Sequence, residues 1–292
     1  MPVSEPLTTY LELRESSADG SEGAGLSHQS GGLVLLHVLE LAAHGEPRGG
    51  VTLVHGAGDH GGRYLAAARV LAEADLAVAL PDLRGHGRSE GERGHSAGSR
   101  EVLRDLTAIQ EHLAYRLPVA PKVLVGQGLG ALYAARYALE QPGSLAGLVL
   151  LSPTWEPRFE LPRPGGLFKA FKKVGPTTPG RVPRETDQLS GDAAARAAWE
   201  ADELVHHVIT LRAAEEAERC AAACRGNLGS AGCPVLVVHG SADALASAAT
   251  GRAQAGGAVE VHVVEGGRHD LLHDVGAADT LARLRDWIVG RL

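Results

Sequence analysis

The sequence lacks an excess of positive charge, a long apolar run and the start of a secreted protein. Its 28 Lys and Arg stand against 35 Asp and Glu, a net charge of −7, so nucleic acid is not an expected partner. No stretch approaches the roughly 18 apolar residues of a membrane-spanning helix. Residues 1–14 have neither the basic start nor the apolar segment of a signal peptide. These absences predict a cytoplasmic protein.

Cysteine is also scarce, and its count is odd. Of the three cysteines, Cys220 and Cys224 lie one helical turn apart, and Cys233 stands at the start of an apolar run. We expect all three to be reduced packing residues. A redox or metal-binding pair formed by Cys220 and Cys224 is the alternative.

Apolar runs alternate with segments of helical period along most of the chain. The hydrophobic fraction of 44% and the charged fraction of 22% are those of an ordinary globular protein. The runs are continuously apolar, which is typical of strands buried on both faces of a parallel sheet between helices. We expect strands within residues 32–41, 51–56, 76–82, 122–126, 145–153, 233–243 and 258–267, and helices within 63–75, 99–117, 131–141 and 271–292.

This alternation stops between residues 153 and 232. The stretch begins rich in proline and glycine, then becomes helical and rich in alanine, and it is too long for a simple connection. It predicts an inserted helical cap, residues 153–232. The cap separates a first core part, 32–152, from a second, 233–292, and an N-terminal strand and flexible loop occupy 1–31. Within the cap, GLFKAFKKVG (166–175) is expected either to touch a membrane surface transiently or to be an ordinary amphipathic lid segment.

Residues 123–136, VLVGQGLGALYAAR, predict a strand, a tight turn and a helix, and the turn fits two motifs. Gly126, Gly128 and Ala131 fit the dinucleotide-binding pattern G-x-G-x-x-A. That pattern requires an acidic residue at the end of the next strand, where this chain has a serine. Gly126 and Gly130 fit the nucleophile elbow G-x-S-x-G, with Gly128 in the place of the serine.

Three distant segments, each just past a predicted strand, favour the elbow. The glycines of residues 55–58, HGAG, allow backbone amides to face a cavity, as an oxyanion hole requires. Asp243 follows one later strand and His269 follows the next, and the carboxyl ends of parallel strands form the active-site edge of such a sheet. The order of elbow, acid and histidine is that of the α/β-hydrolases.

The segments HGAGDHGGRY, DLRGHGRSEGERGH, GQGLG, HGSAD and GGRHDLLHD resemble those of monoacylglycerol lipases and related lysophospholipase-like serine hydrolases, from about residue 32 to the C-terminus. The resemblance implies an α/β-hydrolase fold with a mostly parallel eight-stranded sheet, flanking helices and an inserted helical cap. It implies no cofactor. It also implies a small acyl ester or lipid-like ligand under the cap.

Site residues follow from the resemblance position by position. It implies Asp243 as the acid and His269 as the base. It implies the amides of Ala57 and Leu129 as oxyanion donors, and it places the family's serine on Gly128. The residues expected to support them are His55, Gly56, Gly58, Gly126, Gln127 and Gly130.

The spacing of His269 and His273 also fits a helical zinc site. Such a site needs a third protein ligand, and none is evident in the sequence. The resemblance accounts better for His269 as a base.

Glycine at position 128 removes the nucleophile. Without a hydroxyl no acyl-enzyme forms, and loss of the serine in comparable enzymes lowers turnover by roughly 10⁶. Three hypotheses stay open. In the first, the chain is a pseudoenzyme that binds an acyl or other apolar ligand. In the second, it is a working lipase-like hydrolase in which the glycine is a recent or introduced change. In the third, Asp243 and His269 activate water or abstract a substrate proton.

Overall fold

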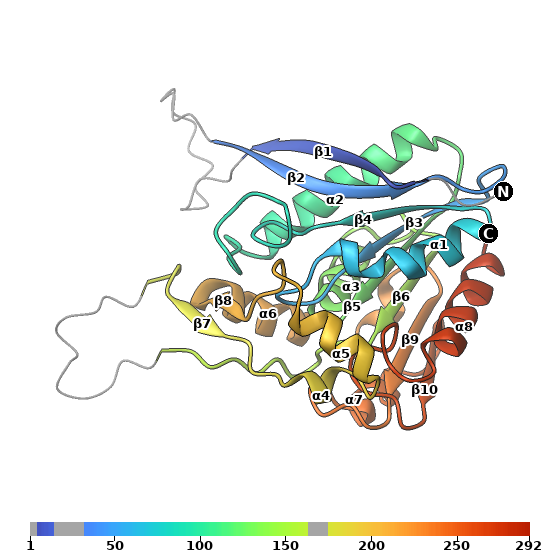
Figure 1. The fold of residues 1–292 in the computed structure, drawn as a ribbon. Helices are drawn as coiled ribbons and strands as arrows, with labels where there is room; N and C mark the ends of the chain where they lie inside the picture. The colour runs from blue at the N-terminus through green and yellow to red at the C-terminus, as the bar shows by residue number, and fades with distance from the viewer. Residues whose placement is uncertain (1–4, 15–31, 163–174) are drawn as a thin grey trace, which may run out of the picture.

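The computed structural model describes residues 5–14, 32–162 and 175–292 (Figure 1). Its centre is a sheet of eight strands in the order β1-β2-β4-β3-β5-β6-β9-β10. Pairing is antiparallel from β1 to β2 and from β2 to β4, and parallel from β4 to β10. The predicted mostly parallel eight-stranded sheet is confirmed. Its strands are Leu7–Arg14 (β1), Leu33–Leu41 (β2), Gly49–Val54 (β3), Leu76–Pro81 (β4), Lys122–Gln127 (β5), Gly147–Leu151 (β6), Val235–Gly240 (β9) and Val259–Val264 (β10).

Helices cover both faces of this sheet. On one face α2, α3 and α6 share a buried apolar cluster, and on the other α1 and α8 share a second (Figure 1). The helices are Gly61–Tyr64 (η1), Leu65–Glu73 (α1), Ser99–Arg116 (α2), Leu129–Glu140 (α3), Thr186–Leu189 (α4), Ala193–Glu200 (α5), Leu211–Cys224 (α6), Leu228–Ser230 (η2), Ala248–Arg252 (α7) and Ala277–Val289 (α8).

The central strands are apolar throughout because each of their faces lies under helices. Along β5, Leu124 packs into the cluster with α3, whereas Val123 and Val125 pack into the cluster with α1 and α8. All three side chains are fully buried. Successive side chains of a strand point to opposite faces, so a strand between two helical layers needs apolar residues at every position.

The cap differs from the sequence-based prediction in its secondary structure. It contains a two-stranded antiparallel sheet, formed by β7 (Pro179–Arg181) and β8 (Val208–Thr210). The strand β8 lies in the alanine-rich part of the cap, where continuous helix was expected. The β-branched Val208, Ile209 and Thr210 favour a strand once a partner strand is beside them. The helix α6 packs against α3 in the main core.

The last helix is shorter than expected. Helix was predicted through residues 271–292, but α8 begins only at Ala277. Gly276 before it has a φ of 83°, and the carboxylate of Asp274 accepts hydrogen bonds from the amides of Gly191, Arg268 and Val275. The bonds from Gly191 and Arg268 hold the preceding segment as a loop.

Three other expectations concern the ends, the cap and the cysteines. Of the predicted N-terminal strand and flexible loop, residues 1–31, the described residues include only 5–14. The predicted membrane-contact segment 166–175 lies outside them, except for its last residue. Of the helices that the structure does describe, none is long and apolar enough to cross a membrane. Cys220, Cys224 and Cys233 are all buried and unpaired, in agreement with reduced packing residues.

The start of α3 lies unusually close to the end of β3. A Cβ on Gly130 would stand 2.2 Å from the carbonyl oxygen of His55, and a Cβ on Gly126 would stand 2.5 Å from Ala131 Cα. Only glycine permits this approach, because no carbon atom fits at such distances. The two outer glycines of the turn are therefore required by packing.

We predict that Gly130→Ala lowers the free energy of unfolding by about 3 kcal/mol, the upper end of the usual cost of overpacking. The matched control is Gly229→Ala, because no heavy atom lies within 4 Å of its added Cβ. Urea unfolding followed by circular dichroism measures both. Equal stability of the two variants would show that the helix moves away without cost.

Candidate functional site

Gly128 occupies the turn between β5 and α3 in a conformation that side chains rarely adopt. Its φ is 57° and its ψ is −115°. Its amide donates a hydrogen bond of 2.9 Å to the carbonyl of Leu151, at the end of the neighbouring strand β6. Backbone angles of this kind are typical of the strained nucleophile elbow. Glycine relieves that strain.

A side chain at position 128 would point at His269. A Cβ built on Gly128 would lie 3.1 Å from His269 Nε2 and 3.6 Å from Thr154 Oγ1. The first distance is shorter than an ordinary carbon contact, so the imidazole would move back by a few tenths of an ångström to admit a side chain. The structure therefore brings Gly128 and His269 together as predicted from the sequence.

His269 is held by Asp243. Its Nδ1 donates a hydrogen bond of 2.9 Å to Asp243 Oδ2, and the Asp243 side chain is fully buried. Asp243 Oδ1 accepts hydrogen bonds from the amides of Leu245 and Ala246, at 2.8 and 2.9 Å. Asp243 follows β9 and His269 follows β10, so the parallel pairing of these strands brings the two residues together.

The pKa of Asp243 lies well below its ordinary value of 3.8. Burial alone would raise it, but the charge of His269 and hydrogen bonds from His239 and His269 outweigh burial. With this carboxylate ionised, the proton of a neutral His269 resides on Nδ1. Nε2, on the side of Gly128, is then the unprotonated nitrogen that a general base requires.

His239 is a site residue that sequence reasoning missed. It is fully buried at the end of β9, and its Nε2 lies 3.2 Å from Asp243 Oδ2 and 3.2 Å from the carbonyl oxygen of Ala246. It is a further donor to the buried carboxylate. Its place four residues before the acid in HGSAD was the available signal.

The loop after β3 faces the N-terminus of α3. Ala57 and Leu129 both line the cavity that His269 also lines. Leu129 is the first residue of α3, where an amide has no partner within the helix. For the amide of Ala57, the described part of the chain supplies no backbone acceptor. Two donors predicted as an oxyanion pair thus line one cavity.

The predicted supporting residues contribute in different ways. His55 accepts a hydrogen bond of 2.9 Å from the Leu83 amide through Nε2, so its Nδ1 carries the proton and donates to the Gly56 carbonyl at 2.7 Å. Burial lowers the pKa of His55, which keeps the ring neutral. Both ring nitrogens are engaged, so His55 orients the loop. Gln127 donates from Nε2 to the His269 carbonyl at 2.8 Å and ties the turn to the histidine.

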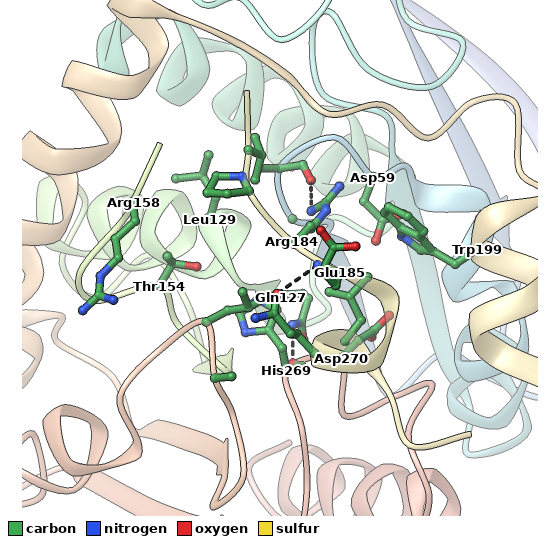
Figure 2. Close-up of a pocket in the computed structure, with 18 of the residues that line it drawn as sticks. Asp59, Gln127, Leu129, Thr154, Arg158, Arg184, Glu185, Trp199, His269 and Asp270 are labelled. Atoms are coloured by element: carbon green, nitrogen blue, oxygen red, sulfur yellow. Dashed lines mark hydrogen bonds between the residues drawn. The ribbon is translucent and has the colours of Figure 1, made fainter. Parts of the chain in front are cut away.

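A cavity of about 360 Å³ opens beside these residues (Figure 2). Figure 2 shows Thr154 and Arg158 toward one end and Asp59 with Trp199 toward the other. Its walls come from the loops after β3, β5, β6, β9 and β10 and from the cap. The lining residues with apolar side chains include Phe159, Val182, Leu189, Trp199 and Leu245. Those with charged side chains are Asp59, Arg158, Arg184, Glu185 and Asp270, and His269 lies among them.

Arg184 joins the cap to the loop after β3. Its guanidinium donates to the carbonyl oxygen of Ala57 at 2.5 Å and to that of His206 at 3.3 Å, and it lies 5.0 Å from the centre of the Trp199 ring. Gly58 lies under this contact with a φ of 64°, and a Cβ there would stand 1.9 Å from the His206 carbonyl oxygen. The cap therefore rests directly on the loop that carries Ala57. The sequence held no local signal for Arg184.

The alternative interpretations of the histidine pair and the turn find no support in the geometry. His273 bonds Asp270 through Nδ1 and the Arg63 carbonyl through Nε2, each at 2.9 Å, so neither nitrogen faces His269. Among the described residues no group of three or more His, Cys, Asp or Glu is arranged to hold a metal ion. Ser152 is buried and does not line the cavity, and it replaces the acidic residue that a dinucleotide site needs.

Comparisons with known proteins agree with this architecture. Residues 45–276 match the family model Hydrolase_4, described as "Serine aminopeptidase, S33". Monoacylglycerol lipase of Mycolicibacterium smegmatis is 30% identical over 255 residues, which cover 85% of this chain and 90% of that protein. Human monoglyceride lipase is 39% identical over 109 residues, 37% of this chain and 36% of the human protein.

Solved structures share the fold over nearly the whole chain. The crystal structure of Paleococcus ferrophilus monoacylglycerol lipase has a TM-score of 0.73 and 25% identity, and the match covers 88% of this chain and 99% of that one. A soluble variant of monoglyceride lipase from Saccharomyces cerevisiae, in complex with a substrate analog, has a TM-score of 0.79 at 16% identity, with 99% and 96% covered. The second likeness concerns the fold alone.

We predict that Asp243→Asn lowers the free energy of unfolding at neutral pH by about 2–3 kcal/mol, because buried donors lose a charged acceptor. The pKa of Asp243 is lower in the folded chain, so its contribution is present above the ordinary value of 3.8 and disappears as the pH falls toward the folded value. The difference between the variant and the parent should therefore begin to shrink below about pH 4 and continue to shrink at lower pH.

Urea unfolding at a series of pH values measures this difference. Asp286→Asn is the control, because that side chain is 69% exposed and should change stability little at any pH. A difference between Asp243→Asn and the parent that stays constant down to the lowest pH would contradict the prediction.

Proposed function

Since the chain belongs to the Hydrolase_4 family of α/β-hydrolases and is related to monoacylglycerol lipases, we propose that it carries a carboxylic-ester hydrolase site without its nucleophile. One observation carries the proposal. A side chain at Gly128 would start 3.1 Å from the free nitrogen of a histidine that a buried aspartate holds. The backbone for a nucleophile is thus present, and the hydroxyl is absent.

The remaining groups suit the chemistry of ester cleavage. His269 accepts a proton from a nucleophile and returns it to the leaving alcohol, while Asp243 fixes the tautomer and stabilises the imidazolium. The amides of Ala57 and Leu129 are the candidates to stabilise the oxyanion that develops on the carbonyl oxygen. A glycine supplies no oxygen to attack that carbonyl, so no acyl-enzyme forms.

The ligand that we propose is a lipid ester or small acyl ester bound under the cap. Phe159, Val182 and Leu245 give the cavity apolar surface for an acyl chain, and its charged residues suit a polar headgroup. The two relatives are named monoacylglycerol lipases, and a monoacylglycerol is a lipid ester of this kind. In this proposal the chain binds the ester and turns it over at most at the residual rate of a site that lacks its serine, roughly 10³–10⁴ above water.

A non-catalytic role as an ester-binding protein uses the same cavity and the same contacts. It differs in that restoring the hydroxyl would not restore turnover, because the bound carbonyl would not lie over position 128. A single substitution separates the two functions.

We predict that Gly128→Ser raises hydrolysis of p-nitrophenyl butyrate by at least about 1000-fold over the parent chain, since loss of the serine costs roughly 10⁶ in comparable enzymes. The double variant Gly128→Ser/His269→Ala is the control and should fall back to the parent rate. Initial rates at 405 nm measure all three proteins. A silent Gly128→Ser that still unfolds cooperatively would contradict the proposed hydrolase site and favour the ester-binding role.

A further inference from the structure

Two polar groups lie on the side of Gly128 to which a side chain would point. They are His269 Nε2 and Thr154 Oγ1, at 3.1 and 3.6 Å from the position of a Cβ on Gly128, and the hydrogen bond of the His269 ring to Asp243 runs through Nδ1. Both residues line the cavity. Thr154 follows β6 and His269 follows β10, so their proximity is a property of the tertiary structure.

The position of Thr154 is set by a strained turn. β6 ends at Leu151, and Ser152 after it has a φ of 42°, which a residue other than glycine seldom adopts. The amide of Ser152 donates to the Val238 carbonyl at 2.8 Å, and that of Thr154 donates to the Gly128 carbonyl at 3.2 Å. Strain of this kind persists where surrounding contacts fix it and gathers at functional sites. The Thr154 hydroxyl is therefore anchored next to Gly128.

Resting on the proposed ester site, we infer that the space beside Gly128 binds a small protic nucleophile between Thr154 and His269. Water fits, as does a primary amine or alcohol of one or two heavy atoms. The nucleophile donates a hydrogen bond to His269 Nε2. The Thr154 hydroxyl makes a second hydrogen bond with the nucleophile, since a hydroxyl can both donate and accept. One lone pair is left to face the ester carbonyl. The chain then transfers the acyl group directly, with no acyl-enzyme.

The reaction balances without any further reagent. The nucleophile forms a bond to the carbonyl carbon as its proton passes to His269 Nε2, and the carbonyl oxygen becomes an oxyanion facing the amides of Ala57 and Leu129. When the oxyanion collapses, the ester C–O bond breaks and the leaving alkoxide takes the proton back from His269. The products are the acylated nucleophile and the free alcohol, and no group is oxidised or reduced.

The test uses hydroxylamine as the nucleophile and glyceryl monobutyrate as the ester, with butyrohydroxamate measured through its iron(III) complex. The parent chain should form hydroxamate above the rate in buffer, with saturation in hydroxylamine. His269→Ala should abolish the excess, because general-base catalysis contributes about 10²–10⁴. A linear dependence on hydroxylamine in the parent would overturn the inference, because it would show that no site binds the nucleophile.

Two pairs of variants isolate the small-nucleophile site. Thr154→Val, which keeps the shape and removes the hydroxyl, should raise the KM for hydroxylamine about tenfold, the worth of one hydrogen bond, and Thr154→Ser should restore it. Gly128→Ala should remove hydroxamate formation, because its methyl group would project toward His269 and Thr154 and exclude the nucleophile by van der Waals contact. N-benzylhydroxylamine should be a poor substrate for the parent. An unchanged KM in Thr154→Val, or full activity in Gly128→Ala, would overturn the inference.

Hydrolysis of the same ester by Gly128→Ser separates this inference from the proposed function. If that variant is active and the parent forms no hydroxamate, the ester site stands and the small-nucleophile site is wrong. If both are silent, the ester does not lie over position 128 and both proposals fail.

Discussion

The close packing of the β5–α3 turn against the end of β3 is the constraint on which the rest of the site depends. Gly130 lies against the His55 carbonyl, and Gly126 lies against Ala131, at distances that exclude any side chain. This contact places the N-terminus of α3 beside the loop after β3, so Leu129 and Ala57 line one cavity. Position 128 lies between the two glycines, directed into the same space. The close glycine contacts, the shared cavity and the direction of position 128 all follow from the close approach of α3 to the end of β3.

A fully buried carboxylate organises the opposite side of the cavity. Asp243 tolerates burial because it accepts from two backbone amides and two imidazoles, which together replace its hydration. Its charge in turn fixes which nitrogen of His269 is free. The same physical effect that stabilises the carboxylate thus determines the acid–base character of the histidine. It does so whether position 128 carries a serine or a glycine.

The cap is part of the site as well as its cover. Arg184 bonds the carbonyl of Ala57, and the His206 amide donates to the carbonyl of Gly58 at 2.9 Å. The loop that supplies a proposed oxyanion donor is therefore held from both sides, by His55 beneath and by the cap above.

The sequence by itself determined the sheet, the glycine turn and the candidate pair Asp243 and His269. Local patterns indicate these features, namely continuous apolar runs, glycine spacing and polar residues at strand ends. Such patterns can be recognised in a sequence without a structure. Thr154, His239 and Arg184, together with the β7–β8 pair of the cap, emerged only from the tertiary structure. Their roles consist of contacts between segments far apart in the chain, and such contacts depend on how the elements pack, which no single stretch of sequence encodes.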